Sequence, residues 1–166
     1  RKKKVKKFKR GYIEKNTIFF DKLKDEFSEQ TLVESGLFYF DEKKKVYIER
    51  FRGRLIFPIN NISGQPIALG GRIIEKSDYL AKYINSPETS FFKKGSNLYN
   101  LDFARKLSNK LDHIYLVEGY MDVVGLSKNG IENAVANLGT SLTDKQILIL
   151  NQFFDDIIIC FDGDES

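Results

Sequence analysis

Two apolar stretches that run into acidic residues decide how this chain folds: IYLVEG at residues 114–119 and IIICFDGD at residues 157–164. The residues between them predict a helix over 121–128, a short strand over 134–137 and a second helix over 143–153, which Thr143 and Gln146 begin with a capping box. The segment therefore reads strand-helix-strand-helix-strand, which is typical of a parallel sheet. The carboxyl ends of such strands share one edge, and ligands bind in the crevice outside that edge.

Three carboxylates follow these strands at the expected edge: Glu118 after the first strand, and Asp162 and Asp164 after the last. Gathered there, they would repel one another unless a cation lay between them. Hard oxygen ligands suit Mg²⁺, which binds one or two carboxylates together with substrate phosphates. The pattern predicts a phosphoryl-transfer site built on a metal ion, with these three residues as its catalytic and metal-binding groups.

The length and composition limit the class of protein. A chain of 166 residues can form one domain, or one large domain with a smaller partner, around a core of useful size. No apolar run approaches the roughly 20 residues that span a bilayer, so we expect no membrane partner. The single cysteine, Cys160, excludes an internal disulfide, and its apolar neighbours predict a core position. His113, the only histidine, lacks the Cys or His partners of a zinc site and is interpreted as a strand-edge residue.

Charge divides the chain into a basic part and an acidic part. Residues 1–110 hold 25 Lys and Arg against 13 Asp and Glu, a net charge of +12, whereas residues 111–166 hold 2 against 10, a net charge of −8. This asymmetry suggests a polyanion partner for the first part and a cation site in the second, with an unevenly charged solvated surface as the alternative. Residues 1–10 carry eight of the positive charges, which fits a nucleic-acid-binding arm, a solvated helix face or a frayed end. The chain is accordingly divided into two subdomains, 1–110 and 111–166.

The first part reads as a mixed α and β subdomain. Apolar spacing and caps predict two short helices within residues 17–36, and alternation predicts a hairpin over 38–49. A longer hairpin follows, with strands over 50–59 and 65–74. Its second strand contains Gly70-Gly71, a pair that indicates a bulge or a close approach of the backbone to a ligand. The overall class is therefore α/β, an α+β N-terminal subdomain followed by a βαβαβ parallel sheet.

Several basic side chains of the first part are candidates for binding phosphate. Arg50, Arg52 and Arg54 lie at i, i+2 and i+4, which places them on one face of an extended strand. Three arginines on one face repel unless they meet an anion, so this spacing favours phosphate contacts. Arg72 follows the glycine pair, where its guanidinium could clamp another phosphate.

Two lysines, Lys82 and Lys94, lie beside aromatic residues. This combination fits a groove that binds a single nucleic-acid strand by charge and stacking. A surface loop with an aromatic anchor explains the same residue types, so both interpretations stay open.

Taken together, these segments resemble the RNA-polymerase core of bacterial-type replicative DNA primase over nearly the whole chain. The last part resembles the TOPRIM fold, which primases share with type IA and type II topoisomerases and some nucleases. The stretch at residues 82–89 belongs to primases in particular. The matching stretches are FKRGY (8–12), RFRGRLIFPI (50–59), GGR (70–72), KYINSPET (82–89), KG (94–95), LY (98–99), EGYMDVV (118–124), NLGT (137–140) and DGD (162–164).

The resemblance implies DNA-templated synthesis of short RNA primers by two-metal-ion nucleotidyl transfer during DNA replication. It implies Glu118 as the catalytic glutamate and Asp162 and Asp164 as ligands of Mg²⁺ or Mn²⁺, with two ions expected. The expected partners are a single-stranded DNA template, ribonucleoside triphosphates and the RNA–DNA hybrid product, in a cytoplasmic, nucleoid-associated bacterial protein. The family's basic and polar residues for template and nucleotide map to Arg52, Arg72, Lys82, Asn85 and Lys94.

The sequence departs from the family in several respects. It does not include the family's zinc ribbon, which would hold zinc upstream, its third acidic motif or its helicase-binding C-terminal domain, so we expect the chain by itself to be weakly active or inactive. Ala68-Leu69 stands where the family usually has an aromatic residue before Gly70. Asp122 is expected to stabilise a helix start rather than bind metal. Two other classes remain open, another TOPRIM enzyme (a topoisomerase or nuclease) or a catalytically inactive single-stranded-DNA-binding fragment.

Overall fold

The computed structural model describes residues 11–16, 18–75, 77–161 and 163. The chain divides into two compact units. The first comprises Arg1–Pro58 and Ala68–Phe91, and the second comprises Ile59–Ile67 and Phe92–Ser166. Helices and strands alternate in the second unit as predicted, so the expected α/β class is confirmed.

A three-stranded parallel sheet forms the centre of the second unit. Its strands are β7 (His113–Val117), β8 (Ala134–Ala136) and β9 (Asp156–Cys160), in the order β8-β7-β9. β7 pairs with β9 from His113 opposite Asp156 to Val117 opposite Cys160. The central position of β7 explains why its sequence is almost continuously apolar, because both of its edges are paired and both faces are covered.

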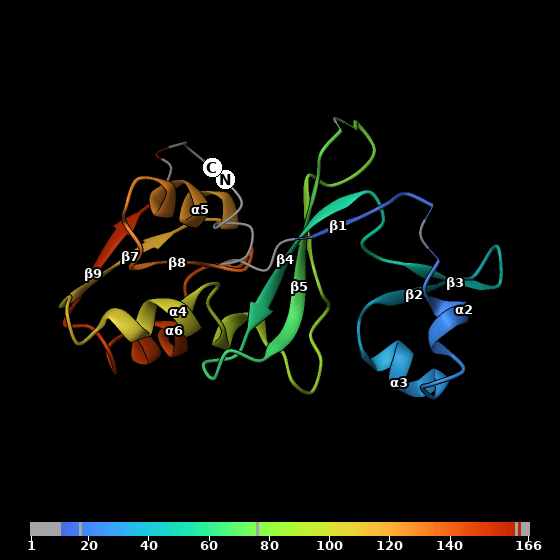
Figure 1. The fold of residues 1–166 in the computed structure, drawn as a ribbon, viewed down its shortest axis with the longest axis horizontal. Helices are drawn as coiled ribbons and strands as arrows, with labels where there is room; N and C mark the ends of the chain where they lie inside the picture. The colour runs from blue at the N-terminus through green and yellow to red at the C-terminus, as the bar shows by residue number, and fades with distance from the viewer. Residues whose placement is uncertain (1–10, 17, 76, 162, 164–166) are drawn as a thin grey trace. The chain divides into compact units, whose positions relative to one another are not determined.

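Helices cover both faces of this sheet. Helix α5 (Tyr120–Lys128) follows β7, and α6 (Asp144–Leu150) follows β8. Figure 1 shows α5 on one face and α4 (Leu101–Ala104) together with α6 on the other. The core between the sheet and α4 and α6 contains Leu98, Leu101, Ala104, Ile114, Leu116, Val135, Leu150 and Phe154. Burial of these apolar side chains is the main force that holds the unit together.

The expected core position of Cys160 is wrong, because its side chain is exposed. Ile159, the preceding residue, is 55% exposed. Within the described part of the chain, β9 lies at the edge of the sheet, where one side lacks a neighbouring strand. The apolar run correctly predicted a strand, but burial depends on neighbours that the run itself does not specify.

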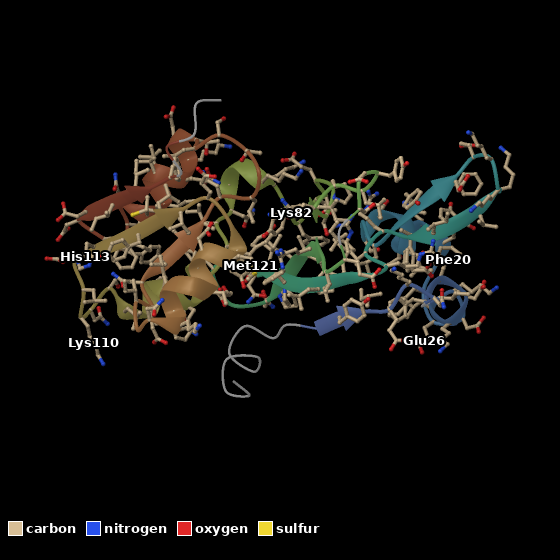
Figure 2. All side chains as sticks on the ribbon, turned by 90° about the horizontal axis from the view of Figure 1, so that it is seen from above. Phe20, Glu26, Lys82, Lys110, His113 and Met121 are labelled. Atoms are coloured by element: carbon tan, nitrogen blue, oxygen red, sulfur yellow. The ribbon has the colours of Figure 1, made fainter. Side chains whose placement is uncertain are left out.

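The first unit begins with two short helices packed on a hairpin. Helix α2 spans Phe20–Leu23 and α3 spans Glu29–Glu34, while strands β2 (Phe38–Asp41) and β3 (Val46–Glu49) pair antiparallel. The predicted cap of α3 is confirmed, since the backbone N–H of Thr31 donates to the hydroxyl of Ser28 at 3.2 Å. The ring of Phe20 stacks on Tyr47 of β3 with centroids 4.4 Å apart, and Figure 2 shows Phe20 beside this hairpin.

A four-stranded sheet follows, in the order β1-β4-β5-β6. Its strands are β1 (Gly11–Ile13), β4 (Arg54–Asn60), β5 (Pro66–Ile73) and β6 (Tyr83–Asn85). The strand expected over residues 50–59 was placed too early, because residues 50–53 form a turn. That turn contains Gly53 at a φ of +70°, a conformation that favours glycine.

Three short helical segments connect these sheets to the second unit's core: η1 (Lys94–Ser96), α4 and η2 (Arg105–Leu107). Residues 101–107 are thus divided between an α turn and a 3₁₀ turn. None of the helices in the described ranges combines the length and apolar character needed to cross a bilayer.

Candidate functional site

Glu118 lies at the carboxyl end of β7, exposed to solvent. Val117 and Cys160 are paired in the register, so residues 118 and 161 leave the sheet from neighbouring strands at the same edge. Asp162 and Asp164, the other two predicted ligands, lie outside the described residues. The described backbone therefore has the strand arrangement on which the predicted acidic site depends. Of the three predicted side chains, the structure describes that of Glu118.

The carboxylate oxygens at this edge of the sheet are suitable ligands for a hard divalent cation. Glu118 offers carboxylate oxygens at a solvent-accessible strand end, and two aspartates follow β9 in the sequence. Carboxylate oxygens suit Mg²⁺ or Mn²⁺ better than they suit softer metals. Among the described residues alone, no group of three His, Cys, Asp or Glu side chains could hold a metal ion.

Asp122 caps the helix that follows Glu118. Its carboxylate accepts a hydrogen bond from the backbone N–H of Gly119 at 3.0 Å, at the start of α5. A negative charge in this position is also favourable to the helix dipole. The expectation that Asp122 stabilises the helix start is confirmed.

Arg72 and Lys82 come together around one aromatic ring of the four-stranded sheet. The Arg72 guanidinium carbon lies 5.8 Å and the Lys82 ammonium 5.7 Å from the ring centroid of Tyr83. Asn85 lies on the same strand, β6, paired opposite Gly70. The Nε of Arg72 is buried and, among the described residues, has no hydrogen-bond partner. Two cations held on one ring form a positively charged surface suited to a phosphate chain.

Arg54 is buried beneath this surface rather than on it. The side chain is 5% exposed, and its Nη1 donates to the carbonyl of Ala81 at 2.9 Å, with longer contacts of 3.5 Å to those of Gly71 and Lys82. Burial lowers the pKa of the Arg54 guanidinium from its usual value. The described contacts give Arg54 the role of fastening the backbone that carries Lys82.

The glycine pair in β5 allows this close packing. A Cβ atom added to Gly71 would lie 2.8 Å from the Phe51 ring and 3.0 Å from Cδ of Arg54. The close approach predicted from the sequence is therefore to side chains of the same unit, and β5 runs through both glycines without interruption.

Arg50 and Arg52 lie in the turn before β4. Nε of Arg50 donates to the carbonyl of Gly36 at 3.1 Å, and its guanidinium carbon lies 5.7 Å from the ring centroid of Tyr39. Nε of Arg52 lies 3.9 Å from a carboxylate oxygen of Glu49. The three arginines expected on one strand face are thus divided, since Arg50 and Arg52 belong to the turn and only Arg54 belongs to the strand.

Lys94 begins the short helix η1 of the second unit. A buried glutamine holds this turn: Nε2 of Gln146 donates to the carbonyls of Lys94 at 3.2 Å and Asn97 at 2.9 Å. Its Oε1 accepts from the backbone N–H of Thr143 at 3.1 Å, which confirms the capping box predicted at the start of α6. Thr143 also donates its hydroxyl proton to the carbonyl of Gly95 at 2.7 Å.

The structure thus groups the predicted residues by unit. Arg72 lies on β5, Asn85 on β6 and Lys82 directly before β6, all in the first unit, whereas Lys94 and Glu118 belong to the second unit. Sequence analysis did not identify the residues that support these cations: Gln146 had a signal in the capping box and Tyr83 in its place beside Lys82, whereas Glu49 had none.

Comparison with known proteins matches two family models along the chain. Residues 1–105 match the family model of the DNA primase catalytic core, N-terminal domain, and residues 112–166 match the Toprim domain. A DNA primase of Clostridium acetobutylicum is 42% identical over 99% of this chain and 27% of its own length. One of Pseudomonas putida is 41% identical over 86% of this chain and 21% of its own length.

Solved structures give the same result. A DNA primase domain from Pseudomonas aeruginosa superposes with a TM-score of 0.88 at 38% identity, covering 98% of this chain and 51% of that one. A DnaG primase catalytic domain bound to single-stranded DNA superposes with a TM-score of 0.86 at 35% identity, covering 99% and 51%. The chain spans about a quarter of the curated relatives' length and about half of these solved chains. The chain therefore belongs to the DNA primase catalytic core family, and its residues 112–166 belong to the Toprim domain.

Proposed function

We propose that this chain provides the template-binding surface and the first two acidic motifs for DNA-templated synthesis of RNA primers. The observation that carries the proposal is the pairing of β7 with β9, which directs residue 118 and the chain after Cys160 to one edge of the sheet. Members of the primase and Toprim families use divalent metal ions such as Mg²⁺. The carboxylates at this edge have the chemistry such an ion requires.

In this proposal, Glu118, Asp162 and Asp164 hold two Mg²⁺ or Mn²⁺ ions between them. Bound there, the ions would lower the pKa of the primer's 3′-hydroxyl and neutralise charge on the leaving pyrophosphate. The carboxylates fix the position of that chemistry at the strand ends. Asp122 keeps its place on the Gly119 N–H and takes no part in metal binding.

The basic residues of the site would bind phosphate groups. Arg72 and Lys82, which lie around the ring of Tyr83, would contact the backbone of a single-stranded template. Lys94, which begins a turn fixed by Gln146, would contact a ribonucleoside triphosphate or the template. Asn85 can hydrogen-bond to a nucleotide from β6. The product of such a site is an RNA–DNA hybrid.

Interactions of a complete primase are also part of the proposal. The relatives are bacterial DNA primases of three to five times this length. We infer that this chain serves within such a protein in the bacterial cytoplasm at the nucleoid, where other parts of the protein would contact the replicative helicase.

A chimera tests the proposed function in an active context. This chain replaces the matching 167-residue segment of the Clostridium acetobutylicum primase, and primer synthesis is measured on single-stranded DNA with Mg²⁺. We expect synthesis, and Glu118→Gln should reduce it by about 100-fold or more, since metal stabilisation of the transition state is worth several kcal/mol. Asp122→Asn is the matched control and should retain most of the activity.

Calorimetry on the chain itself gives an independent measurement. Titration with Mg²⁺ or Mn²⁺ should give binding heat that Glu118→Gln weakens. Undiminished primer synthesis by the Glu118→Gln chimera would remove the metal assignment. Strand cleavage in place of synthesis would favour a nuclease of the same fold.

A further inference from the structure

Asn137 is a buried polar residue at the edge of the parallel sheet where Glu118 lies, and the assignments above give it no role. It follows β8 directly and begins the NLGT stretch of residues 137–140. Its backbone N–H donates to the carbonyl of Val117 at 3.3 Å, which continues the ladder between β7 and β8. Asn137 therefore follows β8 at the same level at which Glu118 follows β7.

Neighbouring segments enclose the end of β8 on both sides. Ala136, its last residue, pairs with Val117 on one side and forms an antiparallel bridge with Tyr99 on the other. Leu138, the next residue but one, is fully buried, and Asn137 itself is 7% exposed. An exposed amide would hydrogen-bond to bulk water, whereas that of Asn137 depends on the groups that share its buried site.

The amide oxygen of Asn137 is buried and has no hydrogen-bond partner within the described part of the chain. Two other buried asparagines of the same unit differ, because their amides are tied to backbone carbonyls. Nδ2 of Asn100 donates to Ala134 at 2.8 Å. Nδ2 of Asn133 donates to His113 at 2.9 Å. A buried acceptor without a donor is unfavourable, so Oδ1 of Asn137 calls for a donor that the described residues do not supply.

The alternation of side chains along the strands places Asn137 on the same face of the sheet as Glu118. Leu116 and Val135, which are paired in the register, belong to the core on the face covered by α4 and α6 (Figure 1). Glu118 and Asn137 each follow two residues later, and side chains two apart share a face. Adjacent strands are about 4.8 Å apart, so a hydrated ion at one side chain is within reach of the other.

A neutral amide oxygen suits the surroundings of a divalent ion that carboxylates hold. Mg²⁺ usually keeps several water molecules when a protein binds it, and these waters donate hydrogen bonds to nearby acceptors. A further carboxylate would add repulsion to a cluster that is already negative. An asparagine oxygen accepts a hydrogen bond without adding charge.

We propose that Asn137 is a positioning residue of the metal site, whose Oδ1 accepts a hydrogen bond from the hydration shell of the divalent ion held by Glu118. This role rests on the proposed function for the presence of that ion. It adds a neutral group to a site otherwise made of carboxylates, and it supplies the missing donor for a buried oxygen. Groups that hydrogen-bond to a metal's ligands commonly change its affinity by about 10- to 100-fold.

Metal binding to the full chain tests this role without catalysis. Free Mn²⁺ is measured by electron paramagnetic resonance as each variant is titrated at pH 8. Asn137→Ala should weaken Mn²⁺ binding by about tenfold. Asn137→Asp keeps the acceptor and adds a negative charge, so it should bind Mn²⁺ at least as tightly as the parent. A role confined to packing predicts the reverse order, since a buried carboxylate disturbs a fold more than alanine does.

Asn133, just before the other end of β8, provides the matched control. It is also buried, at 4% exposed, but its amide donates to the carbonyl of His113 at the amino end of the sheet. Asn133→Ala should bind Mn²⁺ like the parent. Thermal unfolding without metal shows whether each variant is folded. Asn137→Val, which fills about the same space without an acceptor, replaces Asn137→Ala if the alanine variant does not fold.

The same titration of Glu118→Gln separates a failure of this role from a failure of the proposed function. Equal Mn²⁺ affinities of Asn137→Ala and Asn133→Ala would overturn the role of Asn137, as would weaker binding by Asn137→Asp than by Asn137→Ala. If Glu118→Gln weakens binding in that case, the role of Asn137 alone is wrong. If Glu118→Gln leaves binding unchanged, the metal assignment is wrong and the role of Asn137 is lost with it.

Discussion

Lys82 and Lys94 are the two lysines of the candidate site, and each unit fixes its own in a different way. In the first unit, Nη1 of the charged Arg54 donates to the carbonyl of Ala81 at 2.9 Å, next to Lys82. In the second, Nε2 of the neutral Gln146 donates to the carbonyl of Lys94 itself. Both donors are buried, at 5% and 0% exposed.

The difference lies in the cost of burying the donor. A guanidinium loses hydration when buried, which is why the pKa of Arg54 is lowered, whereas a neutral amide that satisfies both of its ends loses little. Gln146 uses its oxygen on the Thr143 N–H and its nitrogen on two carbonyls. Polar side chains thus hold the backbone of both lysines, of which Lys82 is exposed and Lys94 half-buried. We expect the neutral donor, Gln146, to stabilise its unit more than Arg54 stabilises the first.

The largest effect on stability is therefore expected at Gln146. Gln146→Leu keeps most of the volume but leaves the carbonyls of Lys94 and Asn97 and the N–H of Thr143 without this partner. We expect the free energy of unfolding to fall by about 3 kcal/mol, since each unsatisfied buried group costs about 1–3 kcal/mol. Urea denaturation measures it, with Gln152→Leu, at an exposed position after α6, as the control. A loss no greater than that of the control would show that Gln146 does not fix the turn.

Substitution of Arg54 should have the next largest effect on the free energy of unfolding. Arg54→Met retains packing against Gly71 but removes the donor to Ala81, and we expect a loss of about 2 kcal/mol. Arg52→Met, in the half-exposed neighbouring position, should change stability by about 0.5 kcal/mol or less.

For the salt dependence of single-stranded DNA binding, we expect the larger effect at Arg52 and the smaller one at Arg54. Arg52→Met should reduce the salt slope by about 0.7, and Arg54→Met should leave the slope unchanged even if it weakens affinity by displacing Lys82. Fluorescence anisotropy at several salt concentrations measures both. A lower slope for Arg54→Met would mean that its guanidinium reaches a phosphate after all.

The sequence predicted those elements whose signals are local. The Ser28 cap, the Thr143 and Gln146 capping box and the period of the strands are each contained within a few residues, and the structure confirms them. The burial of Arg54 could not be predicted in this way. Its spacing from Arg50 and Arg52 matched a strand face, but Gly53, at positive φ, places the first two in a turn.

The candidate site shows the same limit. That Glu118 ends a strand next to β9 follows from the order of helices and strands, which the apolar pattern supplied. The exposure of Cys160 and the partners of Tyr39 depend on which elements pack beside them, and these lie far away in the sequence. Apart from the local turn at Gly53, long-range packing accounts for what sequence analysis missed.

Substitution of two glycines by alanine distinguishes a position that lacks space for a Cβ atom from one where only helix preference changes. Gly71→Ala in β5 should destabilise the chain by about 1–3 kcal/mol, because the new Cβ would meet Phe51 and Arg54 at 2.8 and 3.0 Å. Gly125→Ala in α5 should instead stabilise it by about 0.5–1 kcal/mol, since no atom lies within 4 Å of its Cβ position and alanine favours helix. Thermal unfolding measures both. Equal signs for the two changes would contradict the close approach at Gly71.

A small effect is expected at Asp122, and it sharpens the contrast with Glu118 four residues earlier. Asp122→Ala removes the acceptor of the Gly119 N–H, and the free energy of unfolding should fall by about 0.5–1 kcal/mol, the usual value of a helix cap. Affinity for Mg²⁺, measured by calorimetry, should stay as in the parent, because this carboxylate is occupied at the start of α5. Glu118→Gln should instead weaken Mg²⁺ binding, since its exposed carboxylate lies at the carboxyl end of β7. A loss of Mg²⁺ affinity in Asp122→Ala equal to that in Glu118→Gln would make Asp122 a ligand and shift the metal centre toward α5.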